Sequence, residues 1–179
     1  MAMNKYLSII NLKVNGLNAP IKRHREAEWI REHDPHICCL QETHLRTKDL
    51  HRLNVKGWTQ IFRANGQEEK AGVGILISDK IDFRKRAKKT DPEGHFIILQ
   101  GRIHQEDITI VNIYAPNIGA PKYIKKILED FKKDIDSNTS IIGDFNTPLS
   151  KMGRSSKQNI NKDIVSLNNA LEEMDLTDI

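Results

Sequence analysis

Cysteine is nearly absent from this sequence of 179 residues, which contains only Cys38 and Cys39. Neighbouring residues of a strand point to opposite faces, so this adjacent pair is a poor candidate for a disulfide. No C-x-x-C spacing accompanies the pair, so the cysteines do not indicate a zinc site either. We therefore expect an intracellular protein that resides in a reducing compartment.

Long apolar runs are also missing. The mean hydropathy is −0.55, and no run approaches the roughly 20 apolar residues that a membrane-spanning helix requires. Residues 1–15 alternate apolar and polar types and lack the apolar block of a signal peptide. We therefore expect no membrane partner. The 28 Lys and Arg against 24 Asp and Glu give a net charge of +4, which permits a polyanionic partner without requiring one.

No repeat, low-complexity tract or linker divides the chain, so we expect one domain spanning residues 1–179. Runs rich in Ile and Val predict strands at residues 6–14, 36–41, 59–63, 72–78, 96–103, 107–114 and 140–145. A further strand would begin at residues 175–179. Because strands outnumber helices and often follow one another directly, we expect an α+β fold with packed sheets and outer helices.

Three segments have the pattern of amphipathic helices. A helix should begin at Asn18 as a cap, with Pro20 in its first turn, and end near residue 32. Its inward residues would be Ile21, Trp29 and Ile30. A second helix at residues 121–136 carries one apolar stripe made of Ile124, Ile127, Leu128, Phe131 and Ile135. The third covers residues 163–174, with Ile164, Leu167, Leu171 and Met174 inward.

Polar residues end three of the predicted strands, where a catalytic face would lie. The segments are QETH (41–44), NIYAPN (112–117) and GDFNTP (143–148). Glu42 and Asp144 offer the hard oxygen donors that magnesium prefers, and Asn146 lies two residues after Asp144. The Tyr114 hydroxyl can bind a phosphate oxygen or stabilise developing charge. A single residue of this kind is usually part of a turn, but the three segments together predict a site.

These motifs, preceded by NGLN at residues 15–18, resemble the endonuclease/exonuclease/phosphatase superfamily. Within that superfamily, the chain closely resembles the apurinic-type endonuclease domain in the second open-reading-frame protein of mammalian long interspersed element retrotransposons. The similarity extends over the whole chain, through IKRHR (21–25), CCLQETHLR (38–46), KGW (56–58), EGHF (93–96), VNIYAPN (111–117) and GDFNTPLS (143–150).

This resemblance implies an α+β four-layered sandwich, in which two β-sheets pack face to face and are flanked by helices. It implies an exonuclease III-like phosphodiesterase that nicks DNA with Mg²⁺, or with Mn²⁺ in its place, and that needs no small-molecule cofactor. It also implies a location in the nucleus and cytoplasm. In such chemistry the metal acts as a Lewis acid on a phosphoryl oxygen, and a carboxylate positions water for in-line displacement.

The resemblance assigns a role to each matching residue. Glu42 corresponds to the metal-binding glutamate, Tyr114 to the tyrosine beside the scissile phosphate, and Asp144 to the aspartate that orients or activates the attacking water. The remaining matches are amides that contact the substrate, namely Asn15, Asn117 and the phosphate-holding Asn146.

Two departures from the family pattern lower the activity that we expect. The family has an asparagine where this chain has Lys13, so a cation replaces a neutral amide beside the metal. Unit charges 4 Å apart interact by about 4 kcal/mol at an effective dielectric of about 20, and a divalent ion doubles that. The family's closing aspartate and Ser-Asp-His motifs have no match within residues 1–179. We therefore expect a domain without its C-terminal portion, catalytically impaired and prone to aggregate.

Several alternatives remain open at the level of sequence. The basic clusters 22–25 and 84–89 either contact a DNA backbone or form a solvated helix face and a flexible hairpin tip, respectively. The function could instead be that of another superfamily phosphodiesterase, acting on abasic DNA or on a lipid phosphate. A third alternative is a non-catalytic nucleic-acid-binding, or inert, retrotransposon-derived fragment. The sequence does not indicate an oligomeric state.

Overall fold

The structure is a computed structural model, and it describes residues 7–147 and 162–176. These residues form two compact units. Unit 1 extends to Tyr114 and also includes Asn138–Gly143, whereas unit 2 comprises Ala115–Ser137 and the described residues from Asp144 onward. No helix among the described residues is long and apolar enough to cross a membrane.

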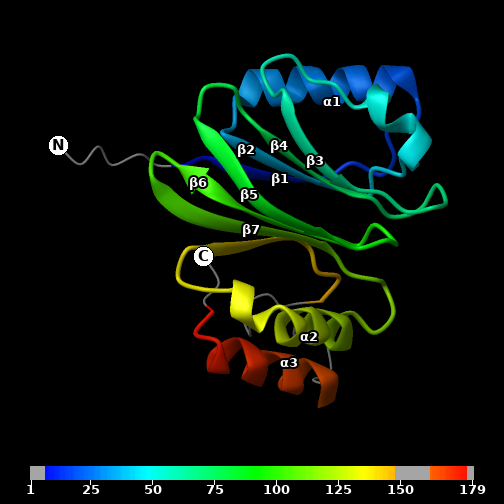
Figure 1. Cartoon of the computed structure of the whole chain (residues 1–179). Helices are drawn as coiled ribbons and strands as arrows, with labels where there is room; N and C mark the ends of the chain where they lie inside the picture. Colours follow the sequence, from blue (N-terminus) through cyan, green and yellow to red (C-terminus); the bar gives the residue numbers. More distant parts are fainter. Residues whose placement is uncertain (1–6, 148–161, 177–179) are drawn as a thin grey trace. The chain divides into compact units, whose positions relative to one another are not determined.

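Within residues 7–147 and 162–176, eight strands form two four-stranded sheets (Figure 1). The first sheet has the order β1-β2-β4-β3, with β1 at Ile9–Lys13, β2 at Ile37–Gln41, β3 at Gln60–Ala64 and β4 at Val73–Ile77. The second has the order β5-β6-β7-β8, with β5 at Phe83–Thr90, β6 at Phe96–Ile103, β7 at Glu106–Tyr114 and β8 at Thr139–Asp144. Strands β1 and β2 are parallel, whereas the β2–β4, β3–β4, β5–β6 and β6–β7 pairs are antiparallel.

The two sheets pack face to face within unit 1. One buried cluster joins Cys39 and Ile75 of the first sheet to Ile97 and Ile110 of the second. Cys38 belongs to a different cluster, on the opposite face of the first sheet. The adjacent cysteines therefore point to opposite faces, and both are free. The predicted α+β fold with packed sheets is confirmed.

Helix α1 spans Pro20–His33 and begins one residue after its N-cap, Ala19, so Asn18 is not the cap as predicted. It buries Ala27 and Ile30 in the cluster on the outer face of the first sheet. The inward placement of Ile21 is wrong, because this side chain is 71% exposed. Ile21 and Ile30 lie about half a turn apart on a helical wheel, so one helix face cannot bury both.

Unit 2 contains helices α2 at Ala120–Asp130 and α3 at Lys162–Glu173, which pack against each other. Ile124, Ile127 and Leu128 of α2 are buried, as predicted. The prediction that this helix continues to residue 136 is wrong. A short 3₁₀ helix, η2, follows at Lys132–Asp134, because tighter i→i+3 bonds replace the α-helical ladder and the backbone becomes extended before β8.

Two elements were absent from the sequence prediction. The 3₁₀ helix η1 occupies Thr47–Arg52. Residues 84–89 form most of β5, an edge strand, rather than a hairpin tip. Its exposed basic side chains give no apolar pattern, but an edge strand tolerates such residues because it has a neighbour on one side only. Of the further strand expected at the end, Asp175 lies in a turn, and residues 177–179 lie outside the described residues.

Candidate functional site

Three predicted site residues of unit 1 meet at the ends of β1, β2 and β7, and we call Lys13, Glu42 and Tyr114 the Glu42 cluster. The Tyr114 hydroxyl donates a hydrogen bond of 2.5 Å to Glu42 Oε1. The Lys13 ammonium lies 3.4 Å from Glu42 Oε2, and the Glu42 side chain is only 14% exposed. Each carboxylate oxygen of Glu42 thus has its own polar neighbour, one neutral and one cationic.

The backbone around Glu42 adopts a conformation that residues other than glycine rarely adopt. Asn15, Glu42, His44 and Ala71 all have φ between 51° and 57°, and each such residue costs on the order of 1–3 kcal/mol. Backbone hydrogen bonds hold these loops together, among them Gly16 N–H to Glu42 C=O at 2.6 Å. Strain of this kind concentrates at functional sites, which supports a functional reading of the loops that surround Glu42.

A buried polar pair, for which the sequence predicted no role, lies next to the Glu42 cluster. Gln41 Nε2 donates to Asn112 Oδ1 at 2.8 Å, and Asn112 Nδ2 donates to the carbonyls of Leu40 and Gly74 at 3.0 and 2.9 Å. Both side chains are fully buried and join the two sheets. These residues precede Glu42 and Tyr114 closely in sequence, so the pair fixes the strands that carry them. The sequence signal that could have indicated this pair is a polar residue at an interior position of an otherwise apolar strand.

His95 supports Tyr114 from its other side. The two rings stack with centroids 5.5 Å apart and an interplanar angle of 6°, and His95 Nδ1 lies 2.7 Å from the Tyr114 carbonyl oxygen. The Tyr114 amide also donates to the His95 carbonyl at 2.7 Å. These contacts fix the position of the Tyr114 ring.

Asp144 and Asn146 lie in unit 2 and form a tight turn with Ala115, which we call the Asp144 turn. Asp144 Oδ1 accepts a hydrogen bond of 3.2 Å from the Asn146 amide, as in an Asx turn. Asn146 Nδ2 donates to the Ala115 carbonyl at 2.6 Å, and the Ala115 amide donates to the Asp144 carbonyl at 2.9 Å. Asn146 has φ of 46°, a value that asparagine tolerates better than most residues.

The remaining predicted substrate contacts are exposed. Asn15 in unit 1 presents its side chain to solvent, while its backbone carbonyl accepts a 2.9 Å bond from Lys22 Nζ. Asn117 in unit 2 is also exposed. In the basic cluster 22–25, the Arg23 guanidinium donates to the carbonyls of Leu17 and Asn18 at 2.9 and 2.7 Å, so it fastens a loop. Pro148, the last residue of the third motif, lies outside the described residues.

The described residues fit a divalent cation poorly. Glu42 is a suitable oxygen donor, but the Lys13 ammonium faces one of its oxygens and the Tyr114 hydroxyl faces the other. Among residues 7–147 and 162–176, no group of three His, Cys, Asp or Glu side chains is arranged to hold a metal. A cation at Glu42 would have to displace the Lys13 ammonium, because the two positive charges repel each other.

Comparison with known proteins gives similarity at the level of sequence. Residues 11–175 match the Endonuclease/Exonuclease/phosphatase family. The chain is 26% identical over 151 residues to the transposon TX1 uncharacterized 149 kDa protein of Xenopus laevis. That alignment covers 83% of this chain and 12% of the TX1 protein, so the chain corresponds to a small part of this relative.

Solved structures with the same fold include two endonucleases. The endonuclease domain of TRAS1, a telomere-specific non-LTR retrotransposon, has a TM-score of 0.67 and 13% identity, covering 94% of this chain and 71% of that one. An AP endonuclease from Archaeoglobus fulgidus has a TM-score of 0.64 and 21% identity, with the same coverage of 94% and 71%. At these identities the similarity establishes the fold.

Proposed function

Because this chain belongs to the Endonuclease/Exonuclease/phosphatase family, we propose that it is a DNA phosphodiesterase of retrotransposon origin whose metal binding is weakened by Lys13. Nucleases of this family are hydrolases that act on phosphodiester bonds and generally use divalent metals. The observation that carries the proposal is the Glu42 cluster, in which a little-exposed carboxylate and a tyrosine hydroxyl share a 2.5 Å hydrogen bond. The similarity to a transposon protein and to the TRAS1 endonuclease domain favours DNA as the substrate.

In this proposal the three predicted site residues of unit 1, Glu42, Tyr114 and Asn15, each have a chemical task. Glu42 is the oxygen donor toward Mg²⁺ or Mn²⁺, which would polarise a phosphoryl oxygen when bound. Tyr114 orients the Glu42 carboxylate through its hydroxyl, and the same hydroxyl is available to a phosphate oxygen when the carboxylate turns toward a cation. Asn15 contacts the substrate from the strained loop after β1.

The residues of unit 2 have the complementary tasks in the proposal. Asp144 orients or activates the attacking water through its carboxylate, one oxygen of which lies 3.2 Å from the Asn146 amide. Asn146 and Asn117 hold the phosphate through their side-chain amides. The tight turn limits the freedom of the Asp144 carboxylate, which lowers the entropic cost of orienting water.

Lys13 is the reason to propose an impaired enzyme. Its ammonium neutralises the carboxylate that a metal would use, and the side chain is 45% exposed, so water screens part of the repulsion. We therefore expect Lys13 to weaken metal binding by about tenfold, which corresponds to about 1.4 kcal/mol. An unscreened pair of charges would weaken it by a larger factor.

Calorimetric titration with Mg²⁺ and Mn²⁺ tests the metal part of the proposal. Lys13→Asn should lower the Kd by about tenfold, and Glu42→Ala should abolish binding. Lys126→Asn is the matched control, because it removes one positive charge from an exposed position of α2. Equal affinity of the original chain and Lys13→Asn for both ions would refute the role of Lys13.

Nicking of supercoiled plasmid tests the activity. Because the chain covers 71% of the TRAS1 domain, the assay uses the chain alone and a fusion that supplies the remaining part from an intact relative. In the fusion, Lys13→Asn should nick about tenfold faster than Lys13, and both chelator and Asp144→Ala should stop cleavage. A fusion with Asn at position 13 that binds metal without nicking would refute the proposed activity.

One observation favours a second candidate, a non-catalytic nucleic-acid-binding protein. The Lys13–Glu42 ion pair removes negative charge from a surface that would otherwise repel phosphates. Under this alternative, DNA binding without metal should weaken in Lys13→Asn and not depend on added Mg²⁺. The metal-dependent proposal expects the opposite, namely that Mg²⁺ strengthens DNA binding in Lys13→Asn.

A further inference from the structure

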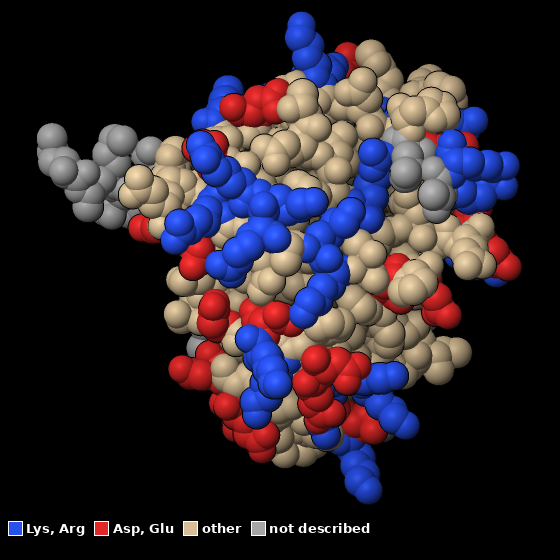
Figure 2. All heavy atoms as spheres, in the orientation of Figure 1, with Lys and Arg blue, Asp and Glu red and all other residues tan. Residues whose placement is uncertain are grey.

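Strand β5, the edge strand of the second sheet, is almost entirely basic. Five of the six residues at positions 84–89 are cations with exposed side chains, namely Arg84, Lys85, Arg86, Lys88 and Lys89. The strand contains no acidic residue. Figure 2 shows Lys and Arg gathered over the region where Figure 1 places β5. The sequence left open whether the basic cluster 84–89 contacts DNA, and the proposed function assigns it no role.

Two of these cations, Lys85 and Lys88, are not neutralised by the described part of the chain. Neither side chain forms a hydrogen bond or an ion pair with residues 7–147 or 162–176. The Arg86 guanidinium, by contrast, lies 3.7 Å from Asp107, a carboxylate that also accepts a 2.9 Å hydrogen bond from Arg102 Nε. The two lysine ammonium groups are therefore available to an anionic partner.

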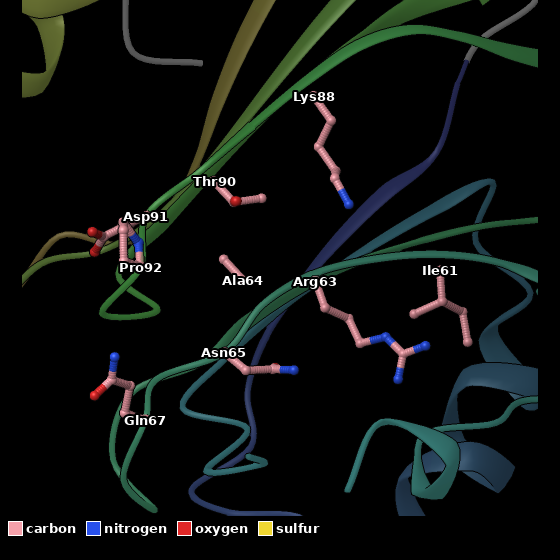
Figure 3. Close-up of a pocket in the computed structure, with 9 residues that line it drawn as sticks. All are labelled: Ile61, Arg63, Ala64, Asn65, Gln67, Lys88, Thr90, Asp91 and Pro92. Carbon is pink, nitrogen blue, oxygen red and sulfur yellow. The ribbon is translucent and has the colours of Figure 1, made fainter. Parts of the chain in front are cut away.

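Lys85 and Lys88 lie on the same face of β5. Lys88 pairs with Leu99, and Lys85 pairs with Gly101, two residues further along β6. Residues two apart in a strand share a face, and so do cross-strand partners. Leu99 is buried between the sheets, so this is the inner face of the second sheet. A pocket of about 460 Å³ lies between β3 and β5, and Figure 3 shows the Lys88 side chain extending from β5 beside it, where it stays exposed.

A register shift in β5 brings the two lysines to one face. The pairing with β6 shifts between Lys85 and Ala87, which leaves Arg86 as an extra residue, as in a β-bulge. Without this extra residue, Lys85 and Lys88 would lie on opposite faces, because they are three positions apart. Their partners on β6 are two residues apart, which is about 6.8 Å. One strand of duplex DNA carries a phosphate about every 3.4 Å of helix axis, so this spacing matches phosphates two apart.

The composition of β5 favours a duplex over a single strand as the partner. Proteins that bind single strands stack the bases on aromatic side chains. Phe83 is the one aromatic residue of β5, and it is buried in the core between the sheets. The strand therefore offers positive charge without a stacking surface. Contacts to phosphates alone suit the regular backbone of a duplex, and they do not depend on the base sequence.

The end of β5 lies at the same end of the second sheet as Tyr114. Thr90 pairs with Ile97, and Ile97 pairs with Asn112, two residues before Tyr114. Two strand spacings separate β5 from β7, which is about 10 Å. The basic strand thus runs from the sheet end that carries Tyr114 along the edge of the sheet. A duplex with one phosphate at the Glu42 cluster has flanking nucleotides within reach of β5.

From these observations we propose that β5 is a docking strand for the backbone of duplex DNA, in which Lys85 and Lys88 contact two phosphates of one DNA strand. The inference rests on the proposed function for its choice of DNA. The contact requires no metal and reads no bases. The remaining exposed cations of β5, Arg84, Arg86 and Lys89, attract the neighbouring phosphates. In a nuclease, this contact would retain the DNA beside the Glu42 cluster.

Binding of a fluorescein-labelled duplex of about two helical turns, measured by anisotropy in chelator at several salt concentrations, tests the proposal without metal or cleavage. Lys85→Glu/Lys88→Glu should raise the Kd at least tenfold. It should also reduce the slope of log K against log salt by about 1.8, since each phosphate contact contributes about 0.9. The matched control Lys122→Glu/Lys126→Glu makes the same change in net charge at exposed positions of α2 and should change the Kd less than twofold.

Two further variants separate charge from side-chain shape and from folding. Lys85→Arg/Lys88→Arg keeps both charges and should keep the original Kd within twofold. Lys85→Gln/Lys88→Gln removes the charges without reversing them and should also lower the salt slope by about 1.8, so the test does not depend on the folding of the reversed variant. An unchanged Kd and slope in the Gln variant would overturn the proposal.

The competing explanation is that lysine on an edge strand serves only to prevent edge-to-edge association. Glutamate also places a charge on the edge, so this explanation expects the reversed variant to stay monomeric in light scattering and to bind DNA with the original Kd and salt slope. That result overturns the proposal, as does an equal loss of affinity in the α2 control. A single strand that binds through Lys85 and Lys88 as tightly as the duplex overturns the choice of a duplex.

The result is separable from the proposed activity. If the fusion does not nick while the chain binds duplex DNA through Lys85 and Lys88, the activity is refuted and the docking strand stands. If the fusion nicks while duplex binding does not depend on Lys85 and Lys88, the docking strand is refuted and the activity stands.

Discussion

The Glu42 cluster and the Asp144 turn position the proposed catalytic residues by different means. Glu42 is held by Tyr114, which is 72 residues away in the sequence, and its strand is fixed by the buried Gln41–Asn112 pair. Asp144 contacts the amide of Asn146, two residues along the chain. Geometry at Glu42 therefore depends on the packing of both sheets of unit 1, whereas much of the geometry at Asp144 is encoded locally. This difference predicts which substitutions disturb stability and which do not.

The largest effect should come from Asn112→Ala. The substitution removes the partner of Gln41 Nε2 and of the carbonyls of Leu40 and Gly74 in a fully buried place. Buried groups left without partners cost about 1–3 kcal/mol each, so the free energy of unfolding in urea should fall by about 3 kcal/mol. Asn54→Ala, at an exposed position, should stay within about 0.5 kcal/mol. A loss below about 1 kcal/mol for Asn112→Ala would show that the pair does not fix the two sheets.

Tyr114→Phe should have the next largest effect, a loss of about 2 kcal/mol in unfolding free energy. The ring and its stacking on His95 remain, but Glu42 loses the hydroxyl that donates to its carboxylate, and hydrogen bonds to charged groups contribute about 1.5–3 kcal/mol. A double-mutant cycle with Glu42→Ala, which removes the acceptor, isolates the interaction. Additive losses in the cycle would mean that the hydrogen bond does not stabilise the cluster.

The cysteines provide a pH test confined to unit 1, since both lie in β2. Burial raises the pKa of the Cys38 thiol from 9.0 to about 12, and burial raises the pKa of Cys39 further. The folded state thus favours the protonated thiols, so their stabilisation is complete below pH 9 and is lost as the pH rises toward 12. At pH 10 the loss should be about 1.4 kcal/mol per thiol relative to pH 8. The variant Cys38→Ala/Cys39→Ala should lose less unfolding free energy between pH 8 and pH 10 than the original chain. An unchanged pH profile would contradict the raised pKa of the two thiols.

The smallest effect should come from Asn146→Ala in the Asp144 turn, a loss below about 1 kcal/mol. Its side chain is exposed and makes one bond to the Ala115 carbonyl, and an exposed hydrogen bond contributes little because water replaces it. The rate at which Cys38 and Cys39 react with a thiol reagent at pH 8 should stay unchanged, whereas Asn112→Ala should accelerate it by opening unit 1. Faster labelling in Asn146→Ala would show that the two regions are coupled.

Several elements of the fold could be predicted because their residues carry an apolar pattern. The strand at residues 96–103 was predicted with its observed bounds. The predicted β2 is one residue too long at its start, and the predicted β4 is one residue too long at each end. Strand β5 could not be predicted, since its side chains are mostly charged and its structure comes from pairing with β6. The burial of Ile21 was predicted wrongly because the local pattern does not fix which face of α1 meets the sheet.

For the candidate site, the sequence motifs alone singled out Glu42, Tyr114, Asp144 and Asn146, and their chemical roles stay predictions. The sequence also showed that Lys13 departs from the family pattern. This could be read without a structure because the identity of a residue and its place in a motif are properties of the local sequence. Only the tertiary structure decided that the Lys13 ammonium lies against Glu42 and that Gln41 and Asn112 pair in the core. The physical reason is that these contacts join separate strands, and such contacts exist only after the sheets have formed their register and packed together.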